Sequence, residues 1–332
     1  MENVTSLNEH NAASPAATLQ LTCIFKFVVL QTGSSFLDLP TSIVSIVSAI
    51  LAIMGNTLIL ISLFRTASIA PPSKVLLGSL ALTDLGVGLL AQPLYIVKSL
   101  SSDKDTKCFL GLLFDLLSGH LSITSFFTMM FISVDKFLAL HLKLRYRVVV
   151  TLKRSILVVV LVRLVALPWS LSYIWFSEVY FMLILSIMPW CLLISSLAFI
   201  KIHRILRRQK RTYQNETQLE SVRRANILKI SRYKKSVNSM LFVFCALLIA
   251  YVPAWMVILL RTIYGNTEIL KMATKLTMTL ILMNSACNPI LYLWRMEDLR
   301  VAALEALEGL IPKSQFRSTS TNAIESFELQ VD

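Results

Sequence analysis

The stretch Asn284–Tyr292 reads NSACNPILY and lies within an apolar run from about Ala273 to Trp294. Its two asparagines and its tyrosine recur every four residues, so they share one face of a helix, with Ser285 beside them. Pro289 has no N–H to donate, and it therefore frees the carbonyl of Ser285 and permits a kink. Buried amides beside broken backbone are typical of functional parts of membrane proteins. The alternative is a kinked helix whose asparagines only bond neighbouring helices.

The composition around this stretch is that of a membrane protein. Of 332 residues, 55% are hydrophobic and only 15% are charged, which leaves too few charges to cover a soluble domain. Seven apolar runs approach the roughly 20 residues needed to cross a bilayer, and we find no internal repeat among them. They are Thr41–Phe64, Val75–Val97, Phe109–Leu140, Ser155–Trp175, Val179–Ile202, Val237–Leu260 and Ala273–Trp294. The sequence therefore predicts an all-α membrane protein, a bundle of seven transmembrane helices over residues 40–294.

The positive charges predict the orientation of this bundle. The net charge is +13, and 24 of the 32 Lys and Arg residues lie on one side of the predicted membrane, against seven on the other. Basic residues accumulate on the cytoplasmic side, so the N-terminus is predicted to lie outside, with the protein in the plasma membrane. Most of the excess lies in a predicted third cytoplasmic loop, Lys201–Lys235. This placement indicates contact with membrane lipids or a protein partner rather than nucleic acid.

The two ends of the chain are predicted to lie outside the bundle. Residues 1–39 form an extracellular segment without a cleaved signal peptide, and Asn3 begins a glycosylation acceptor, Asn-Val-Thr. Cys23 and Cys108 are the only cysteines on the outer side, so we expect them to form a disulfide. Residues 295–311 place apolar side chains three and four apart, which predicts an amphipathic helix on the inner membrane face, followed by a cytoplasmic tail, 312–332. These side chains are Met296, Leu299, Ala303, Leu307 and Leu310.

Other predicted spans also contain polar or helix-bending residues. Asp84 lies in the second span, where a carboxylate costs several kcal/mol unless it is paired or hydrated. The sixth span contains Pro253, which predicts a second kink. The remaining motifs are Gly55-Asn56, a stripe of serines at Ser118, Ser122 and Ser125, and Asp135-Lys136-Phe137 at the inner boundary of the third span.

Together these motifs resemble the rhodopsin-like, class A G-protein-coupled receptors, from about Pro40 to Leu310. Gly55-Asn56 matches the family's GN pair, Leu80 to Asp84 matches its LxxxD, and Asn288 to Tyr292 matches its NPxxY without a change. The very short second extracellular loop is most similar to the branch with melanocortin, lysophospholipid and adenosine receptors. The resemblance implies an extracellular ligand and a heterotrimeric G protein as partners.

The resemblance also implies an allosteric sodium ion among oxygen-bearing side chains, and no other cofactor. Oxygen ligands suit a hard cation such as sodium. The positions that match the family's sodium site are Asp84, Ser125, Asn284, Ser285 and Asn288.

Two departures concern the family's switch residues. The family's DRY reads Asp135-Lys136-Phe137, so a forked guanidinium is replaced by an ammonium, and weak or lost coupling stays open as an alternative. Its CWxP reads Ala250-Tyr251-Val252-Pro253, with Tyr251 in place of Trp. In the mechanism that the resemblance implies, the sixth helix moves about Pro253, Tyr292 belongs to the switch, and Lys136 meets the G protein.

Other functional classes fit the sequence less well than a receptor does. A sodium- or proton-linked transporter would fit the buried Asp84, but the repeated halves typical of transporters are missing. The sequence has no catalytic or metal-binding motif, so we expect no enzyme. Leu282 occupies the Schiff-base lysine position of opsins, Ser118 the aspartate position of amine receptors, and Ile258 the asparagine position of adenosine receptors, which disfavours light, amine and adenosine recognition.

The ligand itself stays open, as a peptide, a lipid or another small molecule. The candidate contacts lie on the predicted outer halves of the third, sixth and seventh helices. Their mixed charge would accept a peptide or an acidic lipid. They are Asp115, Ser118, Ser122, Tyr251, Arg261, Lys271 and Lys275.

Overall fold

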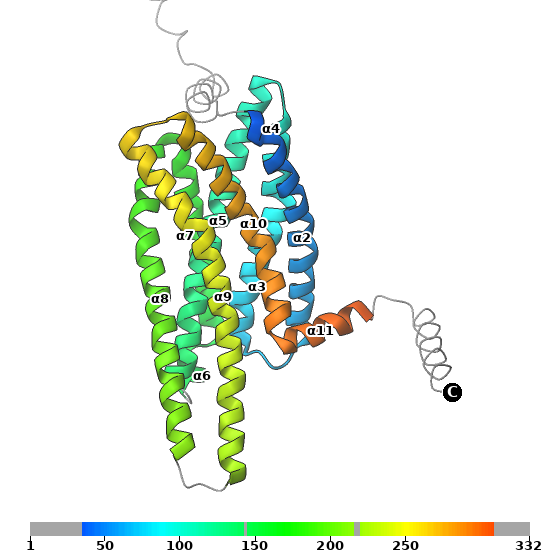
Figure 1. Cartoon of the computed structure of the whole chain (residues 1–332), viewed down its shortest axis with the longest axis vertical. Coiled ribbons are helices and arrows are strands. Elements are labelled where there is room, and N and C mark those ends of the chain that lie inside the picture. Colours follow the sequence, from blue (N-terminus) through cyan, green and yellow to red (C-terminus); the bar gives the residue numbers. More distant parts are fainter. Residues whose placement is uncertain (1–34, 143–144, 216–219, 309–332) are drawn as a thin grey trace, which may run out of the picture.

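The computed structural model describes residues 35–142, 145–215 and 220–308, all as helices and short connections. Figure 1 shows long helices packed side by side, and seven of them are long and apolar enough to cross a membrane. Many side chains on their outward faces are exposed leucines, isoleucines and valines, as expected for contact with lipid. The predicted fold class, a seven-helix membrane bundle, is therefore confirmed.

The helices follow one another along the chain with short connections. After a turn of 3-10 helix at Ser35–Leu37, they are α2 (Asp38–Arg65), α3 (Pro71–Gly86), α4 (Gln92–Leu100), α5 (Lys104–Leu142), α6 (Tyr146–Val149), α7 (Leu152–Trp175), α8 (Ser177–Asn215), α9 (Glu220–Tyr264), α10 (Glu268–Arg295) and α11 (Glu297–Glu308). We call the end of the bundle with Asp38 the outer end and the end with Arg65 the inner end, after the predicted orientation.

The second span is one predicted helix, Val75–Val97, but the structure divides it. A π-helical turn, Val87–Ala91, separates α3 from α4. Pro93 lies two residues beyond this turn and cannot donate the backbone hydrogen bond of a regular helix, which explains the wider turn. The amide of the adjacent Gln92 is fully buried, and it donates to Ser48 Oγ at 2.6 Å and to the Leu282 carbonyl at 3.2 Å.

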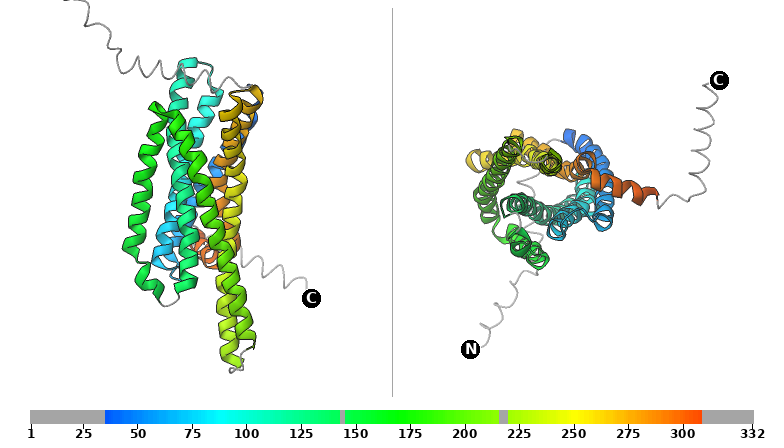
Figure 2. Two further views of the ribbon diagram at one scale, coloured as in Figure 1. Left: turned by 90° about the vertical axis from the view of Figure 1, so that its left-hand side faces the viewer. Right: turned by 90° about the horizontal axis from the view of Figure 1, so that it is seen from below.

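The third cytoplasmic loop is a correction to the sequence-based expectation. Lys201–Lys235 was expected to be a loop, yet α8 continues to Asn215 and α9 begins at Glu220. These two helices project well beyond the other helices at the inner end (Figures 1 and 2). Hydropathy marks only the apolar part of a helix, whereas Lys, Arg and Glu are good helix formers in water.

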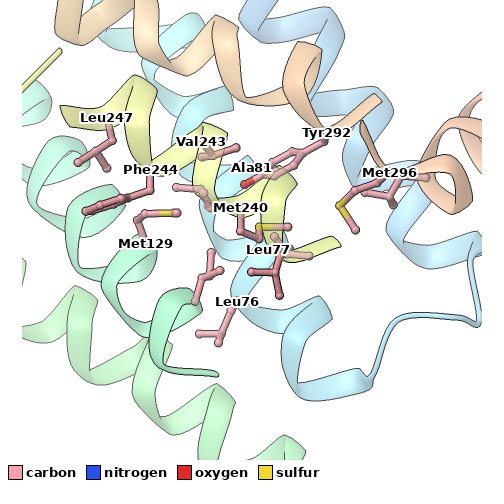
Figure 3. Packing of buried hydrophobic residues seen from close by; sticks show 14 of the residues in the cluster. Leu76, Leu77, Ala81, Met129, Met240, Val243, Phe244, Leu247, Tyr292 and Met296 are labelled. Carbon is pink, nitrogen blue, oxygen red and sulfur yellow. The ribbon is translucent and has the colours of Figure 1, made fainter. Parts of the chain in front are cut away.

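A hydrophobic cluster fills the inner half of the bundle. Figure 3 shows Met129 of α5, Leu77 of α3 and Phe244 of α9 directed toward one another, with Tyr292 of α10 beside them. Tyr292 is 1% exposed. This cluster joins α9 to α3, α5 and α10, so a movement of α9 must repack it.

The break at Pro289 is stabilised by α2. Asn56 Nδ2 donates to the Ser285 carbonyl at 3.1 Å, so the carbonyl that Pro289 leaves free has a partner from another helix. Gly55 lies against the proline ring, and a Cβ there would stand 2.6 Å from Pro289 Cγ. Only glycine allows α2 and α10 to approach so closely at this point.

The helix expected over residues 295–311 is present as α11, which extends sideways from the inner end of the bundle (Figure 1). Leu299, Ala303 and Ala306 are buried on one face, while Leu307 is 44% exposed. Arg65 at the end of α2 donates to the Glu305 carbonyl at 3.0 Å and fixes the helix to the bundle. Leu310 and the predicted tail lie outside the described residues.

Candidate functional site

A cavity of about 270 Å³ lies in the outer half of the bundle, between α4, α5 and α7 to α10. Its inner part is lined by aromatic and aliphatic side chains, including Phe126, Phe127, Trp169 and Trp255. Ser122 and Tyr251 are among its polar groups at this depth. An apolar, concave site with a few converging polar groups is the usual form of a small-molecule site.

The structure places all seven predicted ligand contacts on this one cavity. They come from α5, α9 and α10, which are far apart in sequence. They are Asp115, Ser118, Ser122, Tyr251, Arg261, Lys271 and Lys275.

A buried charged pair that sequence reasoning missed lies on the wall of the cavity. Lys98 of α4 is 3% exposed, and its Nζ lies 3.9 Å from Asp115 Oδ1 and 4.6 Å from the centre of the Phe114 ring. The hydroxyl of Tyr173 donates to the other oxygen of Asp115 at 3.0 Å. Lys98 was counted only as a loop-side charge, because its position near a helix end does not reveal that it points inward.

The outer rim of the cavity holds further ion pairs. Lys275 donates to Asp38 at 2.7 Å and joins α10 to α2. Lys271 pairs with Glu268 at 2.7 Å within α10. Arg261 has neutral acceptors: its Nε and Nη2 donate to Asn266 Oδ1 at 2.9 and 2.5 Å, and its Nη1 donates to Thr274 at 3.0 Å.

A polar core lies below the cavity around Asp84, which is 1% exposed. Asn288 Nδ2 donates to Asp84 Oδ2 at 2.6 Å, and Ser285 also hydrogen-bonds the carboxylate. The buried side-chain oxygens Asn284 Oδ1 and Asn288 Oδ1 have no hydrogen-bond partner among the described residues. Unsatisfied buried acceptors beside a carboxylate provide the kind of oxygen set that a cation or ordered water would satisfy.

A second, small cavity of about 10 Å³ lies between this core and the larger cavity. Ser125, Asn284 and Ser285 line it together with Ser122 and Tyr251, which also line the larger cavity. Its volume is close to that of a single water molecule. Of the four residues predicted to join Asp84 in the sodium site, Asn288 and Ser285 bond its carboxylate, and Ser125, Asn284 and Ser285 line this space.

At the inner end, Asp135 and Lys136 are buried in a hydrogen-bonded cluster. Ser73 of α3 donates to Asp135 Oδ2 at 2.6 Å, and Tyr146 of α6 donates to Asp135 Oδ1 at 2.7 Å. The Nζ of Lys136 donates to Ser73 Oγ at 3.3 Å and lies 3.9 Å from Asp135. The carboxylate therefore has two close donors besides the ammonium group.

Tyr233 links this cluster to α9. Its hydroxyl donates to the backbone carbonyl of Lys136 at 2.5 Å. Burial, followed by the charge of Asp135, raises the pKa of Tyr233 above its ordinary value. Burial and the hydrogen bond to Asp135 likewise raise the pKa of Tyr146. Both phenols therefore stay protonated and donate at physiological pH.

Comparison with known proteins identifies the family. The profile described as "7 transmembrane receptor (rhodopsin family)" matches residues 55–182. The chain is 31% identical to adenosine receptor A2b of Gallus gallus over 133 residues, which cover 40% of this chain and 36% of that receptor. It is 25% identical to histamine H2 receptor of Cavia porcellus over 286 residues, 79% of this chain and 77% of that receptor. These matches support a rhodopsin-like, class A receptor.

The chain is also 30% identical to adenosine receptor A2a of Cavia porcellus, over 39% of this chain and 30% of that receptor. The matches to the adenosine receptors therefore span about a third of the length of those receptors. These relatives are receptors by name, which agrees with the expectation that the chain is not an enzyme.

Several other predicted residues do not line either of the two cavities. Pro253 lies inside α9, two residues from Tyr251 on the cavity wall. Cys108 is disulfide-bonded, while Cys191, Cys245 and Cys287 are free. Cys23 and Asn3 lie outside the described residues, so the Cys23–Cys108 pairing and the glycosylation stay predictions.

Proposed function

We propose that this rhodopsin-like receptor binds an extracellular ligand in the outer cavity and signals to heterotrimeric G proteins from the plasma membrane. The single observation that carries this proposal concerns α9. Tyr251 and Trp255 of this helix line the cavity, and Tyr233 of the same helix bonds to Lys136 at the inner end. One helix therefore contacts both the place where a ligand would bind and the place where a G protein would dock.

The mechanism follows from this arrangement. A ligand that presses on Tyr251 or Trp255 acts on α9 next to Pro253, where the helix lacks one backbone hydrogen bond and bends most easily. Movement of the inner part of α9 away from α5 breaks the Tyr233–Lys136 bond and opens a cleft. Lys136 then faces the end of a G-protein α subunit.

The sodium ion that the family resemblance implies has suitable ligands here. The residues that would hold it are Asp84, Ser125, Asn284, Ser285 and Asn288, and the two unpartnered amide oxygens support this assignment. When bound, the ion would supply positive charge that offsets the cost of the buried carboxylate. Its place directly below the ligand cavity supports a role in holding the resting state.

The ligands of the named relatives are not carried over. Ser118 provides no carboxylate for the ammonium group of an amine, and Asp115, one turn nearer the outer end, is already bonded to Tyr173 and beside Lys98. A sodium- or proton-linked transporter has no observation in its favour beyond the buried Asp84.

The Tyr233→Phe variant tests the proposed function. It removes only the hydroxyl that bonds α9 to α5, and a neutral hydrogen bond contributes about 0.5–1.5 kcal/mol. The active population, and with it basal nucleotide exchange, should rise about two- to tenfold. Full-length receptor in nanodiscs would be mixed with purified heterotrimers from each of the main Gα classes, and GTPγS uptake would be recorded.

The matched control is Tyr264→Phe, which removes an exposed phenol at the outer end of the same helix and should leave exchange unchanged. The proposal is contradicted if neither wild type nor Tyr233→Phe catalyses exchange above empty nanodiscs on any heterotrimer.

A further inference from the structure

The charges of the outer cavity are unevenly distributed. Five basic and two acidic side chains line it, so its net charge is +3. All of them lie within about three turns of the outer helix ends, as Arg261 and Lys275 illustrate. The inner part of the cavity carries no charged residue. A ligand that matches this field has its negative charge at the outer part and an uncharged body below.

Both acidic side chains of the cavity already have hydrogen-bond partners within the chain. Asp38 accepts from Lys275 at 2.7 Å, and Asp115 accepts from Tyr173 at 3.0 Å. The charges of Lys275 and Lys98 beside these carboxylates offset their attraction for a cationic ligand.

Lys98 has unused hydrogen-bonding capacity. Its ammonium group carries three N–H donors, yet its contacts within the described chain are the 3.9 Å approach to Asp115 and the ring of Phe114. At 3% exposure, a buried ammonium group without a close hydrogen bond is costly. Because Lys98 lines the cavity, an acidic group of a ligand can approach it.

Arg261 offers a second anchor. Within the described chain its guanidinium bonds only neutral oxygens, those of Asn266 and Thr274. A guanidinium binds carboxylate or phosphate through paired hydrogen bonds that are stronger than bonds to neutral acceptors. Tyr173, which bonds Asp115 beside Lys98, lines the same cavity as Arg261, so the two cations face one space.

The region below these cations is suited to an apolar body. Tyr251 lies ten residues inward from Arg261 on α9, a depth of about 15 Å. The walls over this depth include the rings of Phe126, Phe127 and Trp255. A peptide would bring backbone amides into this region, where few polar groups could satisfy them, whereas a hydrocarbon body would bury apolar surface without that cost.

We propose that the ligand is an anionic amphiphile: a small molecule with one carboxylate or phosphate, bound by Lys98 and Arg261, and an apolar body that extends toward Tyr251. This inference rests on the proposed function in that the outer cavity is taken as the ligand site. It selects an acidic lipid over the peptide that the mixed charge of the candidate contacts also allows.

The test measures binding directly, without a G protein. Thermal unfolding of the full-length receptor in phosphatidylcholine nanodiscs would be followed with dodecanoate and dodecyl phosphate, which differ in headgroup. Dodecanol supplies the same body without charge, and acetate and inorganic phosphate supply the headgroups alone. The variants are Lys98→Gln, Arg261→Gln and Lys98→Arg. Glu178→Gln is the control, because it removes an exposed charge at the outer start of α8 that does not line the cavity.

We expect dodecanoate or dodecyl phosphate to stabilise the wild type, with dodecanol, acetate and inorganic phosphate far weaker. Lys98→Gln and Arg261→Gln should raise the apparent Kd about tenfold or more, as the loss of a charge-assisted hydrogen bond predicts. Lys98→Arg, which keeps the charge, should retain binding, and Glu178→Gln should change the Kd less than about threefold.

Equal stabilisation by dodecanol, or equal Kd values in all variants, would overturn the proposal. So would stabilisation by short acidic peptides alone, which would indicate a peptide ligand. Nucleotide exchange by Tyr233→Phe requires no probe, so it separates the two ideas. Exchange without probe binding refutes only the ligand class, and probe binding without exchange refutes the signalling function.

Discussion

Nucleotide exchange catalysed by the Tyr233→Phe receptor should fall about tenfold or more when Lys136 is also replaced by Ala. The ammonium group of Lys136 is buried at the inner end of α5, against Ser73 and Asp135. In the proposed mechanism it becomes the cation that meets the G protein once α9 has moved. Asp135 keeps its bonds from Ser73 and Tyr146 in the Ala variant, so the fold should survive.

Lys136→Arg in the same background is the matched control. A guanidinium keeps the charge and adds paired donors, so exchange should be retained or should increase. Receptor amounts would be matched before GTPγS uptake is compared. Full activity in the Ala variant, together with an Arg variant equal to the parent, would show that this position has no role in transduction.

The second large effect concerns Asp84. Sodium at about ten times its dissociation constant should stabilise the wild type by about 1.4 kcal/mol, because a bound ion shifts the folding equilibrium by mass action. This raises the melting temperature by a few degrees. The Asp84→Asn variant loses the charge that attracts the ion but keeps the shape of the side chain, and its sodium response should vanish.

Melting curves in sodium, potassium and choline chloride at equal ionic strength provide the measurement. The Asn variant in choline should melt at or above the wild type, because it no longer buries an unpaired carboxylate. Equal wild-type curves in all three salts, or an undiminished sodium response in Asp84→Asn, would exclude a sodium site at Asp84.

The sequence predicted the parts of this receptor that follow from periodicity. Residues four apart share a helix face, so Asn284, Asn288 and Tyr292 were expected on one side of α10, and all three are buried there. The same reasoning predicts that Ser118, Ser122 and Ser125 form a stripe along α5, and all three line the small cavity.

The parts that were missed depend on contacts between helices. Nothing in local sequence shows that Lys98 points inward, or that Tyr146 and Tyr233, from separate elements, close on Asp135 and Lys136. Pro93 indicates that the helix of the second span is distorted near this residue. It does not indicate whether the distortion is a kink or a π-helical turn, so the π-helical turn was not predicted.

The distance between the inner parts of α5 and α9 provides the most direct test of the central claim, that α9 joins the ligand cavity to the signalling end. Spin labels at His141→Cys and Lys234→Cys, both exposed positions, would be measured by double electron–electron resonance after the three free cysteines are replaced. Compared with the parent receptor, Tyr233→Phe should shift the distribution of spin-label distances toward longer distances. A further Lys136→Ala substitution should leave that shift in place, although nucleotide exchange on the G protein falls. Identical distributions with and without the Tyr233 hydroxyl would contradict the account.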